Sequence, residues 1–404
     1  MAVNKLFFGN TNIRAAKLGS SDVKMYLGNT LVYELGEPVE TRVITTFNVT
    51  NTSSPTIIAG GRYVTGFSGV EIDGVVQPSA VSSYTFSTTG EHTIKYTLSD
   101  LTTINGGSFS GCTNLASVTL PDNVTNIGGN AFTYCSGLTS IDIPSGVTNI
   151  SNSAFLSCNG LTSIDIPSGV TSIGNSAFRS CTSLTSFTFE EGSQLTSIDT
   201  YTFQSCTSLT SINIPDSVTS IGSYAFYGCS GLTSIDIPSG VTTIGGNAFT
   251  NCSGLTSCTI GSGVTSIGGY VFQGCTSLTS IDIPSGVTNI GSAAFSACTS
   301  LTSIDIPNSV TSIGSSAFRG CTSLTSCTIG SGVTTIGNSA FARCSGLTSI
   351  TCNATTAPTI QSATFQNVKS NGILYVPIGS SGYDTWMQNA NYYLGLYNWT
   401  KVEQ

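Results

Sequence analysis

Residues 135–157 read CSGLTSIDIPSGVTNISNSAFLS, and variants of this stretch recur through the middle of the chain. Eleven cysteines mark the copies, separated by 23 residues in every interval except one of 25. Each of these cysteines has an Ile eight residues before it, a Phe three residues before it and a Leu three residues after it. The eleven are Cys112, Cys135, Cys158, Cys181, Cys206, Cys229, Cys252, Cys275, Cys298, Cys321 and Cys344. Such a fixed period is typical of one supersecondary unit repeated along the chain.

The order of residues within one copy predicts a coil that closes on itself. Residues 141–143, Ile-Asp-Ile, place both Ile on one face of a short strand, a conformation that suits β-branched side chains. Residues 144–146, Pro-Ser-Gly, turn the chain, and residues 147–150 form a second short extended segment. The Asn-Ala-Phe sequence at residues 130–132, which leads into the next cysteine, predicts a helical or 3₁₀ turn.

A single coil of this kind cannot fold alone. Burial of about eight apolar side chains contributes ~1.5–3 kcal/mol each, whereas ordering the 23 residues of a coil costs ~1–2 kcal/mol per residue. Stacked coils cover one another's edges and pair their strands, so stability grows with the number of repeats and the ends need caps. The sequence therefore predicts a repeat solenoid of eleven coils with short parallel strands over residues 101–350.

The unit C-x-x-L-T-S-I-D-I-P-x-x-V-T-x-I-G-x-x-A-F-x-x closely resembles the BspA-like leucine-rich repeat. The resemblance covers about three fifths of the chain and implies a right-handed leucine-rich-repeat coil. It also implies the role of a bacterial cell-surface adhesin. One coil departs from the pattern, because residues 189–195, FEEGSQL, replace the usual I-P-S-G-V and add two residues. We expect a surface bulge there.

The register of the cysteines argues against a disulfide framework. Cysteine is small and apolar, so in-register stacking predicts an internal ladder of free thiols. Disulfides along that ladder would need a geometry that the repeating backbone does not offer at every step. Three further cysteines, Cys258, Cys327 and Cys352, occupy strand positions and have no C-x-x-C partner, so we expect no zinc site and no other metal.

Residues 1–38 predict a small N-terminal module of β-hairpins. Gly with Asn or Ser between apolar residues is typical of hairpin turns. A segment this short cannot bury a core of its own, so we expect it to dock onto another protein. The stretch KMYLGNTLVYE at residues 24–34 resembles a short module of virion and tail-associated proteins from bacteriophages of gut bacteria. The candidate docking residues are Leu27, Gly28, Asn29 and Tyr33.

Two further segments flank the solenoid. Residues 39–100 predict a small all-β domain that caps the first coil, with candidate strands at 43–49, 63–67, 70–75, 84–86 and 92–98. Residues 351–404 predict an aromatic-rich C-terminal cap with a short helix at 383–391. The aromatic side chains there either seal the last coil against water or contact a sugar or protein partner.

Nothing in the sequence points to an enzyme or a cofactor. The only histidine is His92, and it lies in a strand pattern outside the repeat. No phosphate-binding loop, dinucleotide-binding motif or H-E-x-x-H motif occurs. Charged residues make up only 8% of the chain and the net charge is −8, so no basic face exists to bind nucleic acid or an anionic membrane. No apolar run is long enough for a membrane span, and residues 1–10 predict no secretory signal.

One exposed column of the predicted strands is a candidate binding face. Its acidic members are Asp142, Asp165, Asp236, Asp282 and Asp305. The first two lie on adjacent coils, as do the last two, and either a cation or solvent and neighbouring hydroxyls could relieve their repulsion. Threonines such as Thr139 and Thr162 run beside the column. Their hydroxyls suit hydrogen bonding to a glycan or a protein, although Thr also simply favours strands.

Three functions fit these observations. The first is a non-enzymatic structural and adhesion protein of a bacteriophage virion, anchored on another virion protein by its N-terminal module. Its solenoid would contact a glycan or protein of the host surface. The alternative is a bacterial cell-surface BspA-like adhesin, and the third is an intracellular scaffold, because fold does not fix function. Each allows the chain to form homo-oligomers.

Overall fold

The computed structural model describes residues 13–18, 22–27, 30–34, 42–60, 66–100 and 102–404. Near the N-terminus, β1 (Ile13–Leu18), β2 (Asp22–Leu27) and β3 (Thr30–Glu34) form a three-stranded antiparallel sheet. Leu27 pairs with Thr30 and Tyr33 pairs with Met25. The other two predicted docking residues, Gly28 and Asn29, lie outside the described residues.

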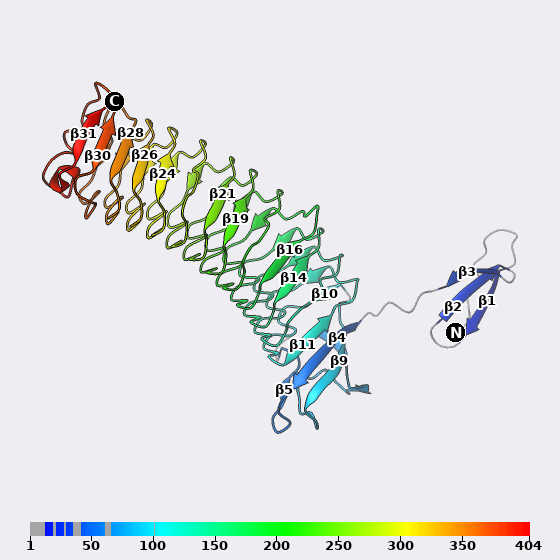
Figure 1. Ribbon diagram of the computed structural model, residues 1–404. Helices are drawn as coiled ribbons and strands as arrows, with labels where there is room; N and C mark the ends of the chain where they lie inside the picture. Colours follow the sequence, from blue (N-terminus) through cyan, green and yellow to red (C-terminus); the bar gives the residue numbers. More distant parts are fainter. Residues whose placement is uncertain (1–12, 19–21, 28–29, 35–41, 61–65, 101) are drawn as a thin grey trace.

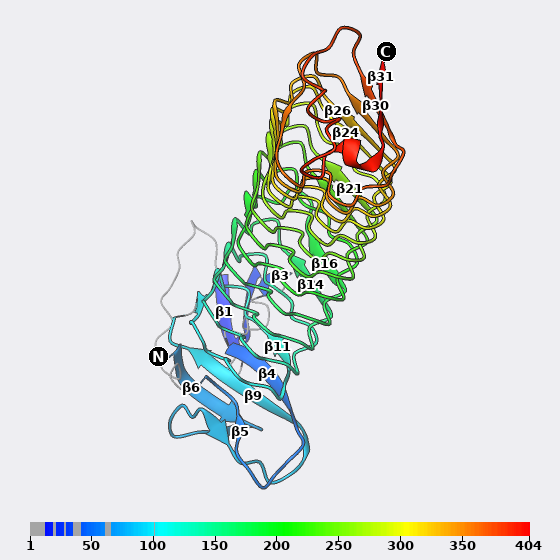
Figure 2. The ribbon, with the colours of Figure 1, turned by 90° about the vertical axis from the view of Figure 1, so that its left-hand side faces the viewer.

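A second antiparallel sheet joins the predicted cap to the first coil (Figures 1 and 2). Its strands, in spatial order, are β11 (Leu115–Thr119), β4 (Arg42–Val49), β9 (Gly90–Leu98), β6 (Phe67–Ile72) and β7 (Val75–Val76). A separate pair consists of β5 (Thr56–Ile57) and β8 (Ser83–Tyr84). Because β11 belongs to the first coil, backbone hydrogen bonds continue from this sheet into the solenoid.

Two of the predicted strands in this region differ from the structure. The single strand predicted at residues 70–75 is two strands, because Asp73 (φ 45°) and Gly74 (φ 83°) form a tight turn between β6 and β7. The strand predicted at 84–86 is instead β8, which ends at Tyr84. Most of the strand predicted at 63–67 lies outside the described residues.

The predicted repeat solenoid is confirmed as a row of stacked coils with parallel strands (Figure 1). We call the segment just after each repeat cysteine the strand side. Its strands are β14 (Ser163–Ile166), β16 (Ser186–Phe189), β19 (Ser234–Ile237), β21 (Ser257–Ile260), β24 (Ser303–Ile306), β26 (Ser326–Ile329), β28 (Ser349–Cys352), β30 (Ile373–Val376) and β31 (Thr400–Glu403).

Two-residue strands mark the next segment of each coil. They are β10 (Thr103–Ile104), β12 (Asn126–Ile127), β13 (Asn149–Ile150), β15 (Ser172–Ile173), β17 (Ser197–Ile198), β18 (Ser220–Ile221), β20 (Thr243–Ile244), β22 (Ser266–Ile267), β23 (Asn289–Ile290), β25 (Ser312–Ile313), β27 (Thr335–Ile336) and β29 (Thr359–Ile360). Each Ile of these strands is buried, and within each of the three sheets that they form it lies in register with the Ile of the neighbouring strand.

The core is built from two internal columns. The phenylalanines form a continuous stack from Phe109 to Phe365, with neighbouring ring centroids 5.2–5.9 Å apart. Beside them, each cysteine of the 23-residue repeat from Cys135 to Cys344 donates a hydrogen bond from its thiol to a Phe carbonyl of the preceding coil, as from Cys135 Sγ to Phe109 O at 3.0 Å. All fourteen cysteines are buried and free. The predicted ladder of thiols is therefore present and also makes polar contacts.

The turns that lead into each cysteine are not helical. Asn130 (φ 57°) and Tyr134 (φ 62°) adopt the left-handed conformation, and corresponding residues do so in coil after coil. The amide of Phe132 donates to Ala154 O of the next coil at 2.7 Å. The predicted helical or 3₁₀ turn was therefore wrong, because amide bonds to the next coil alternate here with short bonds inside the coil, such as that from Cys135 N to Phe132 O, and no helical ladder forms. We call this segment, around each stacked Phe, the turn side.

Threonine hydroxyls reinforce the contacts between coils. The amide and hydroxyl of Thr162 both donate to Thr139 O, at 3.0 and 3.2 Å. Thr185 makes the same pair of bonds to Thr162 O. A second column, which includes Thr148 and Thr171, repeats the arrangement. Repeated Thr therefore has a structural role beyond its preference for strands.

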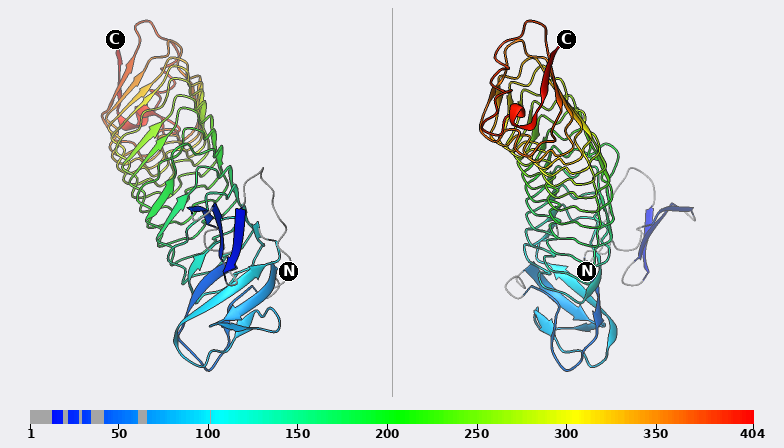
Figure 3. Two further views of the ribbon diagram at one scale, coloured as in Figure 1. Left: turned by 90° about the vertical axis from the view of Figure 1, so that its right-hand side faces the viewer. Right: turned by 60° about the vertical axis from the view of Figure 1, so that its left-hand side comes forward.

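The parallel ladder does not stop at Ile350, where we expected the solenoid to end. It continues through β28 and β30 to β31, near the C-terminus. The C-terminus lies at the opposite end of the rod from the β4–β9 sheet (Figure 3). Sequence periodicity missed β30 and β31 because neither carries the repeat motif. Their alternating buried and exposed residues are enough to extend the sheet.

The aromatic side chains of the C-terminal segment mostly seal the last coil. Tyr383 and Trp386 are buried, and they donate hydrogen bonds to Ala354 O at 2.7 Å and Pro358 O at 3.0 Å. Trp386 also packs against Phe365, the last ring of the stack. The helix predicted at 383–391 is absent, since residues 383–387 form turns that place both aromatic rings against the coil. A 3₁₀ helix, η2 (Leu394–Tyr397), follows.

Candidate binding surface

The structure places all five predicted aspartates in one exposed column of the strand side. Asp165 lies on β14, Asp236 on β19 and Asp305 on β24. Asp142 and Asp282 occupy the same position in coils that carry no strand on this side. Thr139 and Thr162 are exposed beside the column. Sequence reasoning therefore identified the face correctly as a set of neighbouring, solvent-facing residues.

Strand pairing along this column varies from one coil to the next. Where Thr follows Asp, the strands pair, as in Asp165 with Thr188, Asp236 with Thr259 and Asp305 with Thr328. Thr188 also donates a hydrogen bond from its hydroxyl to the Asp165 carboxylate. At the two steps where Asp follows Asp, the described backbone shows no such ladder.

A hollow opens at each of those two steps. One, of about 130 Å³, is lined by Asp142 and Asp165 together with Glu190. The other, of about 370 Å³, is lined by Asp282 and Asp305. Like charges directly opposite one another destabilise neighbouring strands. In the described backbone the ladder is also missing between Thr259 and Asp282 and between Thr188 and Asn213, so the repulsion adds a local cost at the paired aspartates but does not by itself account for the missing strands.

The chemistry of the face is dominated by hydrogen-bond acceptors. Carboxylates accept only, and the hydroxyl protons of Thr162 and Thr185 are already donated to carbonyls of the preceding coil. What the Thr column leaves for a partner is oxygen lone pairs and methyl groups. A ligand with donors of its own therefore suits the carboxylates and the Thr oxygens, while exposed serines such as Ser163 on the same strand face can still donate.

The described residues contain no group of three or more His, Cys, Asp or Glu side chains placed to hold one metal ion. Each aspartate pair offers two carboxylates, and the fourteen cysteines are inside the core. Within the same described residues, no helix has the length and apolar character needed to span a membrane.

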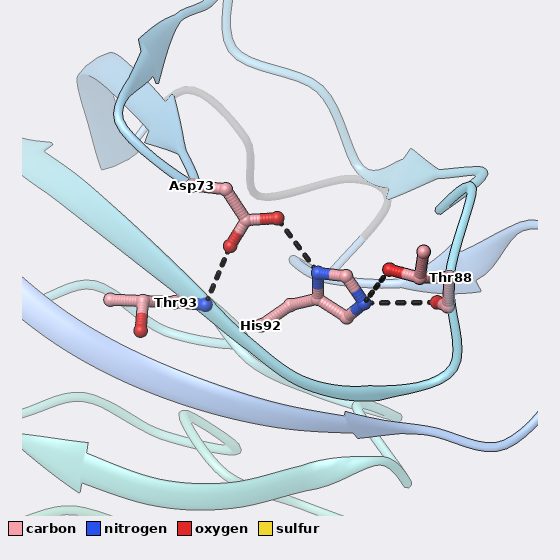
Figure 4. Close-up of polar contacts among 4 residues, drawn as sticks. All are labelled: Asp73, Thr88, His92 and Thr93. Carbon is pink, nitrogen blue, oxygen red and sulfur yellow. Dashed lines mark hydrogen bonds and ion pairs between the residues drawn. The ribbon is translucent and has the colours of Figure 1, made fainter.

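His92 makes a compact set of contacts in the β4–β9 sheet (Figure 4). Its Nδ1 lies 2.7 Å from Asp73 Oδ2, and its Nε2 lies 2.9 Å from Thr88 O and 3.4 Å from the Thr88 hydroxyl. A hydroxyl, an imidazole and a carboxylate in this order resemble a nucleophile activated by a base. Here, however, Nε2 must donate its proton to the Thr88 carbonyl, so it cannot accept one from the hydroxyl. The arrangement fits a structural ion pair.

Sequence reasoning missed an aromatic cluster on the turn side. The rings of Tyr201 and Tyr224, on adjacent coils, stack with centroids 5.0 Å apart, and Tyr227 lies 5.7 Å from Tyr224. The guanidinium of Arg179 lies 5.7 Å from the centre of the Tyr201 ring. The sequence did carry a signal for this cluster: the residue two positions before the stacked Phe is Tyr in several nearby coils.

The comparisons with known proteins identify the family. The family model described as the BspA type leucine rich repeat region matches residues 79–208, 196–324 and 265–383. These matches span well over half of the chain, so the protein belongs to the BspA-type leucine-rich repeat family. The predicted resemblance is thereby confirmed. No curated protein matches the chain.

Several solved structures are similar to it. A leucine-rich repeat protein from Bacteroides ovatus is 30% identical over 67% of this chain and 85% of its own, with a TM-score of 0.37. A leucine rich cell surface protein from Faecalibacterium prausnitzii is 28% identical over 64% and 84%, with a TM-score of 0.33. The pneumococcal vaccine antigen PcpA is 19% identical over 77% and 86%, with a TM-score of 0.45.

The repulsion between paired aspartates predicts that neutralising one of them stabilises the protein. We expect Asp282→Asn to raise the free energy of unfolding by a few tenths of a kcal/mol, measured by urea denaturation at low salt. The gain should shrink as salt screens the charges. Asp236→Asn is the matched control, because Asp236 lies between Asn213 and Thr259 and has no like-charged neighbour in the column. Equal effects of the two variants would contradict repulsion between Asp282 and Asp305 as the cause. If CaCl₂ stabilised the wild type but neither variant, a cation bound between these two aspartates would be the explanation instead.

The contacts of His92 predict a pH dependence. Burial lowers the pKa of His92, but the hydrogen bonds to Asp73 and Thr88 and the charge of Asp73 outweigh it, so the net pKa is raised above 6.5. The stabilisation from this group is therefore full below its unfolded pKa and is lost as the pH rises through the raised folded value. Because the chain has one histidine, its imidazole NMR signals report this pKa directly. We expect Asp73→Asn to lower it, and a wild-type value at or below 6.5 would refute the ion pair.

Proposed function

We propose that this protein is a non-enzymatic adhesion protein that holds a donor-rich partner on its strand side. The observation that carries the proposal is the exposed column of carboxylates beside internally bonded threonines, a surface rich in hydrogen-bond acceptors. Sugar hydroxyls and the amide and ammonium groups of a host-surface protein supply the donors that such a face requires.

The build of the solenoid supports this function. Many threonines of the face are bonded to the coil before them, as Thr162 is to Thr139 O and Thr233 is to Thr210 O. The columns are consequently fixed in place before a partner arrives, and a preorganised surface loses less conformational entropy on binding. The rod also presents many equivalent positions, so weak contacts at successive coils add through multivalency.

Two placements of the adhesin follow from different parts of the chain. Membership of the BspA-type family supports a location on the surface of a bacterial cell, in keeping with the adhesin role that the repeat implies. The alternative placement, on a bacteriophage particle, takes the three-stranded β1–β3 sheet as a docking module on another virion protein. We favour the bacterial surface, because the family match covers most of the chain, whereas the virion placement depends on the short N-terminal segment alone.

Binding to mucin tests the function. We expect the full chain to bind immobilised gastric mucin, and the double variant Asp165→Lys, Asp236→Lys to lose at least about tenfold in affinity, because it places cations among the acceptors. The double variant Asp122→Lys, Asp216→Lys is the matched control, since it makes the same change of charge at two exposed positions outside the column. Deglycosylated mucin distinguishes a glycan partner from a protein partner. Equal binding by all three proteins, or no binding, would reject the strand side as the adhesive face.

Immunogold labelling of the native protein tests the placement. Label on the bacterial envelope supports the placement that we favour. Label on phage particles, lost when residues 1–38 are deleted, would instead establish the virion reading.

A further inference from the structure

Three tyrosines of the turn side adopt a backbone conformation that bulky residues rarely occupy. The φ angles are 60° at Tyr201, 58° at Tyr224 and 63° at Tyr270. Each stands two residues before a stacked Phe, a position that other coils fill with smaller residues such as Asn247 (φ 61°) and Ser316 (φ 59°). A bulky side chain in the left-handed region costs free energy, and such strain is often retained for function.

These tyrosines are not needed to cover the core. Phe203 and Phe226 are the stacked phenylalanines that follow Tyr201 and Tyr224 by two residues, and both are completely buried. Phe318 follows Ser316 at the same spacing, and it is completely buried as well. The small residue thus serves the fold equally well. The strained tyrosines gain nothing for the hydrophobic core that would explain their presence.

The surrounding residues turn the tyrosines into a mixed aromatic and polar surface. Tyr201 and Tyr224 stack at 5.0 Å with an angle of 20° between their rings. Asn251 donates from Nδ2 to the hydroxyl of Tyr227 at 3.4 Å, which fixes that ring beside Tyr224. The exposed guanidinium of Arg179 closes the cluster at the Tyr201 end. Tyr270, two coils beyond Tyr224, is 44% exposed.

From this surface we infer a carbohydrate-binding site, formed by Arg179, Tyr201, Tyr224, Tyr227, Asn251 and Tyr270, that takes a neutral glycan chain running along the rod. Tyrosine supplies a rigid, amphipathic contact at low cost in side-chain entropy. The ring surfaces pack against the C–H faces of sugar rings, while the tyrosine hydroxyls, Asn251 and Arg179 hydrogen-bond to sugar hydroxyls. Tyr224 and Tyr270 are separated by about 10 Å, two steps of the ~4.8 Å spacing between parallel strands, so a linear chain can contact both.

This site lies on the turn side and goes beyond the function proposed for the strand side. The two proposals can be tested separately, since substitutions in the aspartate column leave every residue of the tyrosine site in place. The strain at the tyrosines also provides a readout that an ordinary structural role would not give. Replacing a strained, dispensable tyrosine with a residue suited to the left-handed region should stabilise the protein or leave its stability unchanged, while removing the contact with the ligand.

Affinity electrophoresis of the full chain tests the site, in native gels that contain soluble amylose, galactomannan or yeast mannan. We expect at least one polysaccharide to retard the wild type. Tyr224→Asn, which introduces the residue that occupies the same position at Asn247, should weaken the retardation about tenfold or more, as expected for a central aromatic anchor. Its melting temperature should equal or exceed that of the wild type.

Tyr134→Asn is the matched control. Tyr134 is also left-handed (φ 62°) and 56% exposed, but it lies outside the cluster. Its replacement should leave retardation unchanged. Absence of retardation by all three polysaccharides, or equal retardation of Tyr224→Asn and wild type, would overturn the inference. A lower melting temperature of Tyr224→Asn would assign Tyr224 to the fold, and self-association in sedimentation that this variant abolishes would assign the cluster to a second copy of the chain. Either result also overturns it.

Discussion

Hydrogen bonding between successive coils, at a fixed register of 23 residues, is the constraint on which the rest of this structure depends. A coil satisfies only part of its backbone groups by itself, through short turns such as the bond from Leu138 N to Cys135 O. Thr162 bonds to Thr139 O, the amide of Phe132 bonds to Ala154 O, and Cys135 bonds to Phe109 O, so every part of the coil contacts a neighbour. The phenylalanine rings then stack because the backbone holds them in line. Stability is accordingly a property of neighbouring coils together.

This constraint divides the residues of each coil into two groups. Those that point inward or bond to the next coil are nearly invariant along the chain, whereas the exposed positions are free to vary. Variation at two of these positions gives the molecule its distinct surfaces. The strand-side column carries Asp, Thr or Asn, and Tyr replaces Ser or Asn on the turn side at Tyr201, Tyr224 and Tyr270. Function is therefore expected where the repeat tolerates differences.

The sequence predicted the solenoid, the buried cysteines and the exposed aspartate column, because each follows directly from spacing. It did not reveal the left-handed turns, since an Asn-Ala-Phe sequence is compatible with a helical turn until the bonds to the next coil are known. The strands β30 and β31 were missed for a similar reason, as their pairing depends on the coil beside them. The tyrosine site became visible only when Tyr201 and Tyr224 were aligned by coil and their φ angles were known.

Titration of the thiols tests the stacked-coil account most directly. Burial raises the pKa of Cys181 to about 12, so its reactive thiolate is scarce at neutral pH. The account predicts that none of the fourteen cysteines reacts promptly with a thiol reagent in the native protein, that all of them react in guanidinium chloride, and that reductant leaves the melting temperature unchanged. Rapid labelling of the native repeat cysteines, or disulfides between them, would contradict a core built on an internal ladder of thiols.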